Sequence, residues 1–99
     1  MDYKVILSRP ALRDLGDIAH FIAQDNSSAA ERVGFELVRL AESLAFMPRR
    51  GGQLQARPGV RRLVSDPYLV TYRIDETHGV IYIQRFWHAK RDPKSWLPG

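Results

Sequence analysis

The chain has 99 residues, of which 44% are hydrophobic, and a formal net charge of +4 at pH 7. This length fits one domain, 1–99, with a single modest core, and the apolar content is higher than that of a disordered chain. Cysteine is absent and no run approaches the roughly 18 apolar residues of a membrane span, which excludes a disulfide framework, thiolate chemistry and a transmembrane helix. The N-terminus also lacks the apolar core of a signal peptide, so we expect a cytoplasmic protein.

The first quarter of the chain predicts a strand followed by a helix. Residues Tyr3 to Leu7 are mostly β-favouring, and Ser8 can cap a helix that carries Pro10 in its first turn. Apolar residues then recur at the spacing of one helical face. They are Ala11, Leu15, Ile18, Ala19 and Ile22. The pair Asp25-Asn26 breaks this pattern.

A second helix is predicted from Ser28, because Ser28 and Glu31 have the spacing of a capping box. Its apolar stripe consists of Val33, Leu37, Leu40, Ala41, Leu44 and Met47. Pro48 and the Gly51-Gly52 pair end the pattern. The short link between the two helices indicates an antiparallel helical hairpin.

The second half predicts a loop, Gln53 to Gly59, and then three strands. The strands are Val60–Asp66, Tyr68–Ile74 and Val80–His88, with a hairpin turn at Asp75–Gly79 and an irregular tail at Ala89–Gly99. Segregated helices and a three-stranded meander are typical of an α+β domain. We therefore expect the helical hairpin to pack on one face of a mainly antiparallel sheet.

Charge is divided unevenly between the two halves. Residues 49–99 carry ten Lys/Arg against four carboxylates, whereas residues 1–48 carry five against seven. Twelve of the fifteen basic side chains are Arg, whose planar fork binds phosphate or carboxylate through two hydrogen bonds. The pattern predicts a basic face for an anionic partner, and composition alone leaves nucleic acid and an acidic protein as alternatives.

Five short motifs, in this order, resemble the RelE/ParE family of toxins from type II toxin–antitoxin modules. They are Ser8-x-x-Ala11-x-x-Asp14-Leu15-x-x-Ile18, Leu44-x-x-x-Pro48-x-x-Gly51, Gly59-x-Arg61-Arg62, Tyr68-x-Val70-x-Tyr72-Arg73 and Ile83-x-Arg85-x-x-His88-x-x-Arg91-Asp92. The resemblance covers nearly the whole chain. It implies a toxin that is neutralised by a cognate antitoxin, with no cofactor.

Within this family the chain is more similar to the ParE branch, because of its ending His88-Ala89-Lys90-Arg91-Asp92. The RelE-branch ribonucleases usually place a Tyr near the C-terminus, whereas here Trp96 stands at about that place and no Tyr follows Tyr82. The resemblance therefore implies growth inhibition through DNA gyrase. The alternative is a ribosome-dependent mRNA endoribonuclease.

The candidate site residues each have a structural alternative. Either Arg61 or Arg62 can grip an anion, because neighbours in a strand point to opposite faces, or both can be charges on a solvated edge strand. Arg85 lies in an apolar strand and can form an ion pair with a carboxylate of the first helix, or share a basic concavity with Arg73. His88 can transfer protons in the ribonuclease hypothesis, with Arg61 or Arg62 and Arg85, or can be a structural residue at a strand end.

The tail contributes two further candidates for binding the target or the antitoxin, Arg91 and Trp96. Trp and Arg are common anchors of protein interfaces, although Trp96 can also cover the core. Tyr68 and Tyr72 share a strand face with apolar residues, which favours core packing over base stacking. The three histidines are scattered, so the sequence predicts no metal site.

Overall fold

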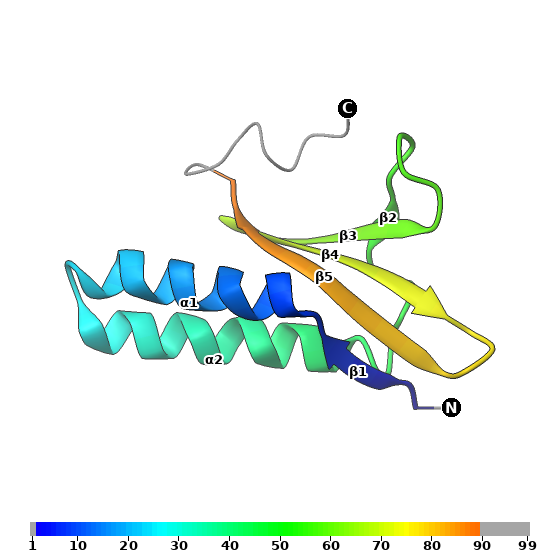
Figure 1. Cartoon of the computed structure of the whole chain (residues 1–99), viewed down its shortest axis with the longest axis horizontal. Coiled ribbons are helices and arrows are strands. Elements are labelled where there is room, and N and C mark those ends of the chain that lie inside the picture. Colours follow the sequence, from blue (N-terminus) through cyan, green and yellow to red (C-terminus); the bar gives the residue numbers. More distant parts are fainter. Residues whose placement is uncertain (1, 90–99) are drawn as a thin grey trace.

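The structure is a computed structural model that describes residues 2–89. It consists of two helices and a five-stranded sheet, in the order β1 (Lys4–Leu7), α1 (Arg9–Ala23), α2 (Ser27–Ser43), β2 (Gly52–Gln53), β3 (Val60–Ser65), β4 (Tyr68–Asp75) and β5 (Val80–His88) (Figure 1). The predicted α+β architecture is confirmed. Arg91 and Trp96 lie outside the described residues.

The start of α1 follows the prediction. Ser8 is the N-cap, and its hydroxyl oxygen accepts a hydrogen bond of 3.2 Å from the backbone N–H of Ala11. The same hydroxyl donates to the backbone carbonyl of Gln84, at 3.0 Å. One serine therefore both begins the helix and fixes its first turn against β5.

The predicted N-cap of α2, Ser28, is wrong by two residues. Asn26 has extended backbone angles and is the N-cap, and its side-chain oxygen accepts from the N–H of Ala29 at 3.0 Å. Ser28 consequently lies inside the first turn, where it cannot form the expected capping box with Glu31. The helix also ends at Ser43, so Met47, which was assigned to the apolar stripe, lies in the following turns and is mostly exposed.

The strand order in the sheet is β1-β5-β4-β3-β2. β1 runs parallel to β5, whereas the other neighbours are antiparallel, so the predicted meander of β3, β4 and β5 is present. β2 was predicted as loop, because a two-residue strand leaves no pattern in a sequence. It pairs Gly52 with Arg62 and Gln53 with Arg61.

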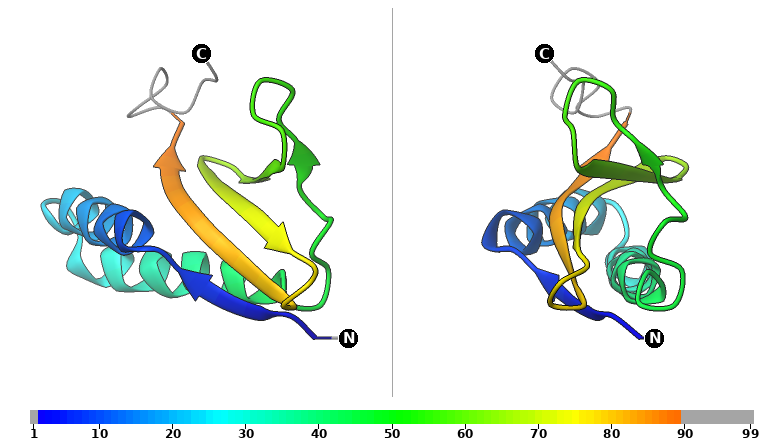
Figure 2. Two further views of the ribbon diagram at one scale, coloured as in Figure 1. Left: turned by 45° about the vertical axis from the view of Figure 1, so that its right-hand side comes forward. Right: turned by 90° about the vertical axis from the view of Figure 1, so that its right-hand side faces the viewer.

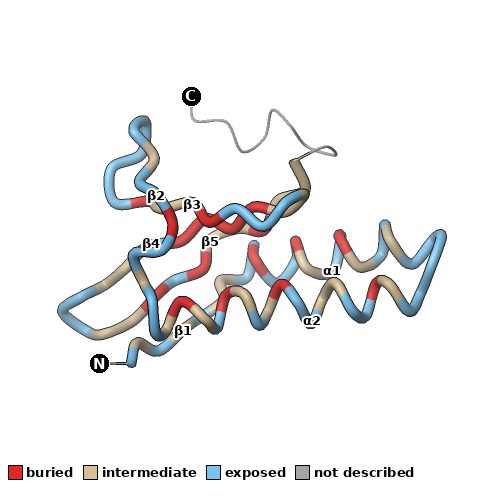
Figure 3. The backbone as a smooth tube through the Cα atoms, turned by 180° about the vertical axis from the view of Figure 1, so that it is seen from behind, coloured by how far each residue is buried: buried red, intermediate tan, exposed pale blue. Residues whose placement is uncertain are grey.

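The helical hairpin covers one face of the sheet, and α1 lies closest to β5 (Figures 1 and 2). Most of the buried apolar residues form one cluster between these two layers (Figure 3). Its members are Ala11, Ile18, Leu37, Ala41, Leu44, Leu63, Val70, Tyr72, Ile81, Ile83 and Phe86. The sheet face opposite the hairpin receives no helix within the described part of the chain, and we call it the open face.

The segment after α2 is attached to the core through Tyr72. The Tyr72 hydroxyl donates to the carbonyl of Pro48 at 2.7 Å and accepts from the N–H of Gly51 at 2.9 Å. Burial raises the pKa of this phenol, and the hydrogen bond from Gly51 partly opposes that rise. The predicted core position of Tyr72 is therefore correct, and its hydroxyl also satisfies two backbone groups of this segment.

No helix within residues 2–89 combines the length and the apolar character that crossing a membrane requires.

Candidate binding site on the arginine-bearing sheet

The register of the sheet places three arginines on the open face. Arg62 on β3 pairs with Thr71 on β4, which pairs in turn with Arg85 on β5. Each is a neighbour of a core residue in its strand, and adjacent strand residues point to opposite faces, so the backbone directs this row away from the helices. The pairing of β4 with β5 shifts register between Thr71 and Tyr72, and the Arg85 guanidinium reaches back to Asp14 of α1. Arg73 lies two positions further along β4, opposite Tyr82, and is exposed.

Arg61 belongs to the opposite side of the sheet. It pairs with Tyr72, a core residue, and its Nη1 donates to the carbonyl of Gly51 at 2.6 Å and to that of Arg49 at 3.5 Å. This guanidinium therefore holds the loop that follows α2. Of the two adjacent arginines, Arg62 is the one on the open face.

Arg85 forms the ion pair with the first helix that was one of its two predicted roles. Its Nε lies 2.7 Å from Oδ2 of Asp14 and its Nη2 lies 3.0 Å from Oδ1, which is a bidentate pair. Oδ2 of Asp14 also accepts from the backbone N–H of Phe86 at 3.0 Å. The Arg85 guanidinium lies 4.4 Å from the ring centroid of Trp87, within the range of a cation–π contact.

The exposure of the two partners is unequal. The Asp14 side chain is 11% exposed and that of Arg85 is 43% exposed. Asp14 is thus buried at the junction of α1 and β5, while Arg85 still reaches solvent. The pair connects the helical hairpin to the sheet and leaves part of the guanidinium at the surface.

His88 pairs in register with Tyr68, and the two rings meet edge to face with centroids 5.2 Å apart. Tyr68 packs against the core cluster, and burial together with the charge of Glu36 raises the pKa of its hydroxyl. His88 therefore lies beside the helix-facing side of the sheet. The groups named for the ribonuclease hypothesis are divided, with Arg62 and Arg85 on the open face and Arg61 and His88 toward the helices.

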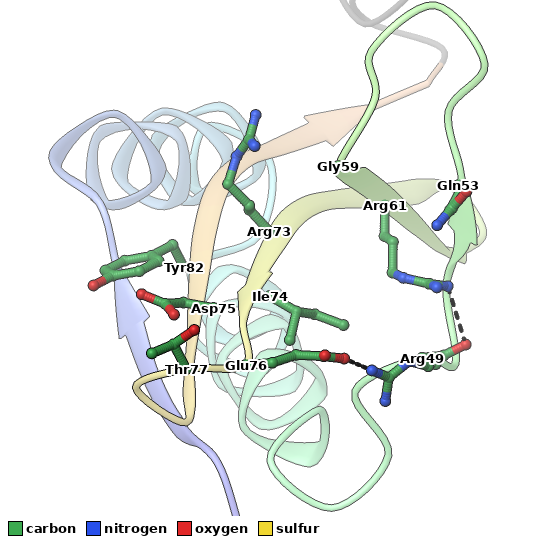
Figure 4. A pocket seen from close by; sticks show the side chains of 10 residues that line it. All are labelled: Arg49, Gln53, Gly59, Arg61, Arg73, Ile74, Asp75, Glu76, Thr77 and Tyr82. Carbon is green, nitrogen blue, oxygen red and sulfur yellow. Dashed lines mark hydrogen bonds and ion pairs between the residues drawn. The ribbon is translucent and has the colours of Figure 1, made fainter.

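The β4–β5 hairpin extends beyond the start of β3, and a hollow of about 620 Å³ lies beside it (Figure 4). We call this hollow the notch. Its lining consists of Arg49, Gln53, Gly59, Arg61, Arg73, Ile74, Asp75, Glu76, Thr77 and Tyr82. Arg49 and Gln53 were not predicted as site residues, because only the folded loop brings them beside β4.

A second hollow of about 670 Å³ lies between the helices, and we call it the hairpin groove. Small and apolar side chains dominate its lining, which includes Ala19, Ala30, Gly34 and Val38. Phe35 stands at this groove and is 72% exposed. The sequence carries a signal for this residue, since Phe35 is an aromatic residue outside the predicted apolar stripe of α2.

Among residues 2–89, no group of three or more His, Cys, Asp or Glu side chains is arranged to hold a metal ion. The chemistry of the described surface is instead that of guanidinium groups, a few exposed aromatic rings and an apolar groove. Such a surface suits recognition of an anionic or amphipathic partner.

A pair of helices on a five-stranded mixed sheet matches the fold of the RelE/ParE-like toxins. The profile described as ParE toxin of type II toxin–antitoxin system, parDE, matches residues 5–93. The chain belongs to this family.

The relatives carry names from both branches of the family. The chain is 36% identical over 89 residues to Toxin RelE2 of Caulobacter vibrioides, covering 89% of this chain and 97% of that protein. It superposes with a TM-score of 0.71 and 27% identity on a chain of the RelBE2 toxin–antitoxin complex from Mycobacterium tuberculosis, covering 89% and 99% of the two chains. A chain of the chromosomal ParDE system from P. aeruginosa gives a TM-score of 0.73 at 22% identity, covering 87% and 95%, and shares the fold.

Proposed function

We propose that this toxin arrests growth by binding DNA gyrase, and that a cognate antitoxin neutralises it. The observation that carries this proposal is the match of residues 5–93 to the ParE toxin family. The open face supports it, because Arg62 and Arg73 present guanidinium groups from neighbouring strands. Binding alone is sufficient for this activity, so no catalytic group is required.

The hairpin groove is the surface on which the antitoxin binds in this proposal. Exposed apolar surface of this kind is typical of a partner interface, and an amphipathic helix would bury Phe35 together with the groove floor. An acidic segment of the same antitoxin would pair with the arginines of the sheet. The structural relatives include toxins solved in complex with their antitoxins, which supports such a partner.

A ribosome-dependent endoribonuclease is the second candidate, because the curated relative is named Toxin RelE2. Cleavage of RNA by attack of the 2′-hydroxyl needs a base, an acid and a cation around one phosphate. The candidate groups, which are Arg61 or Arg62 with Arg85 and His88, are divided between the two faces of the sheet, since Arg85 belongs to the open face whereas His88 lies on the other side beside Tyr68. This separation favours the gyrase proposal.

Expressing the toxin in cells from an inducible promoter distinguishes the two candidate functions. The gyrase proposal predicts that DNA synthesis stops within minutes while a reporter mRNA stays intact, and that co-expression of the neighbouring antitoxin gene restores growth. Arg62→Gln is expected to weaken the arrest, whereas Arg32→Gln, which removes an exposed charge on α2, is the matched control. Rapid mRNA cleavage that His88→Ala abolishes would overturn the proposal in favour of the ribonuclease.

A further inference from the structure

The notch lies beside the end of β4 that extends past its pairing with β3. The pairing of β3 with β4 ends at Val60 and Arg73, so the edge of Ile74 and Asp75 that faces away from β5 has no strand partner within the described part of the chain. Three arginines from different segments line the hollow beside this edge (Figure 4). The notch therefore combines an unpaired strand edge with positive charge.

Two of the three guanidinium groups, those of Arg61 and Arg49, already have partners within the protein. The hydrogen bonds of Arg61 to the carbonyls of Gly51 and Arg49 both use Nη1, and a guanidinium has five N–H donors in total. Arg49 pairs with Glu76 on the turn between β4 and β5, and both side chains are more than half exposed. An ion pair this exposed is weak and can exchange for another carboxylate.

Arg73 is the third. Its Nη1 lies 2.9 Å from the position that a Cβ would occupy on Gly59, so the guanidinium crosses directly over this turn. Gly59 has a φ of +84°, which glycine adopts without strain, and a larger residue would block Arg73. Within residues 2–89 the Arg73 guanidinium has no hydrogen-bond or ion-pair partner, so it is available to a ligand.

We propose that the notch binds an extended, acidic peptide segment. Its backbone would extend the sheet along the edge of Ile74, and its carboxylates would pair with Arg73 and with Arg49. The carboxylate of Glu76 occupies Arg49 in the unbound protein and acts as an internal competitor for this ligand. Ile74 and Tyr82 provide apolar contacts for the side chains between the acidic ones.

An acidic peptide fits better here than nucleic acid. Asp75 and Glu76 line the same hollow, and they would repel a chain that carries a charge on every phosphate. A peptide can place a neutral side chain opposite these two carboxylates, whereas every nucleotide carries a phosphate. Only a peptide can also form main-chain hydrogen bonds with an open strand edge.

The probe is an N-acetylated, C-amidated hexapeptide of alternating Glu and Val, titrated into the ¹⁵N-labelled full chain. We expect its largest amide shifts at Gly59 and at residues 73–77, and no such shifts with the matched peptide of alternating Gln and Val. Arg73→Gln is expected to weaken binding roughly tenfold, because a charge-assisted hydrogen bond is lost. Glu76→Gln is expected to strengthen it roughly two- to five-fold, because the competing carboxylate is removed.

Arg32→Gln removes one exposed charge on α2 and is the control for net charge. Unchanged thermal unfolding of the Arg73 and Glu76 variants separates a binding effect from misfolding. Equal affinity for all four proteins, or amide shifts in the notch with hexauridylate but not with the acidic peptide, would overturn the proposal. The titration measures no growth inhibition, so its result is independent of whether gyrase is the target.

Discussion

The ion pair between Asp14 and Arg85 makes a strong and specific prediction about stability. Replacing Asp14 by Ala removes three hydrogen bonds at once, two from Arg85 and one from the backbone N–H of Phe86. The Phe86 N–H is buried and loses its partner, which costs about 1–3 kcal/mol. Breaking a fully buried pair costs about 3–5 kcal/mol, but the Arg85 side chain is 43% exposed and regains water when Asp14 is removed. We therefore expect a total loss of about 3 kcal/mol.

The measurement is equilibrium unfolding in urea, followed by circular dichroism and by tryptophan fluorescence, to which Trp87 beside Arg85 contributes. Glu42→Ala removes an exposed carboxylate from α2 and is expected to change the free energy of unfolding by less than about 0.5 kcal/mol. Asp14→Asn keeps the shape of the side chain, and its loss of unfolding free energy is expected to lie between those of Asp14→Ala and Glu42→Ala. If Asp14→Ala lowers the free energy of unfolding no more than Glu42→Ala does, the ion pair does not connect α1 to β5 and the prediction is wrong.

Three other predictions follow from the described geometry. Gly51→Ala is expected to destabilise the fold by roughly 2 kcal/mol or more, measured by urea unfolding, because its Cβ would lie 2.8 Å from the hydroxyl of Tyr72. The side-chain and backbone hydrogen bonds from His78 lower the pKa of Asp75, so their contribution to stability is present above the unfolded-state pKa and is lost on acidification below about pH 4. An NMR titration should show that His78→Ala raises this pKa, and an unchanged value would contradict the assignment. Phe35→Asp is expected to leave thermal unfolding nearly unchanged but to weaken antitoxin binding at least tenfold by calorimetry, and full affinity would exclude the hairpin groove as the interface.

The fold was largely predictable because its elements carry strong local signals. The apolar spacing of α1 and α2 and the alternation in β4 predict those elements directly. The start of α2 was misplaced because two capping patterns overlap at Asn26 and Ser28, and only the backbone angles at Asn26 decide between them. β2 exists through its pairing with β3, which no local pattern of two residues can reveal.

The candidate site was less predictable, because it depends on contacts between distant segments. The sequence indicated that Arg85 needs a partner, but Asp14 lies 71 positions away and Asp17, the other carboxylate of α1, was equally plausible. Strand alternation shows that Arg61 and Arg62 face opposite sides of the sheet. The pairing with Tyr72 and Thr71 is needed to decide which of the two arginines lies on the open face. The notch was the hardest site to predict from the sequence, because one of its lining residues, Arg49, comes from the loop after α2.

The most direct test of the proposed activity is DNA supercoiling by purified gyrase in the presence of the purified toxin. The proposal predicts inhibition with accumulation of cleaved DNA, reversal by the antitoxin, and a weaker effect of the Arg62→Gln and Arg73→Gln variants than of Arg32→Gln. Gyrase that supercoils DNA at its full rate in the presence of a folded toxin that still stops growth would contradict it.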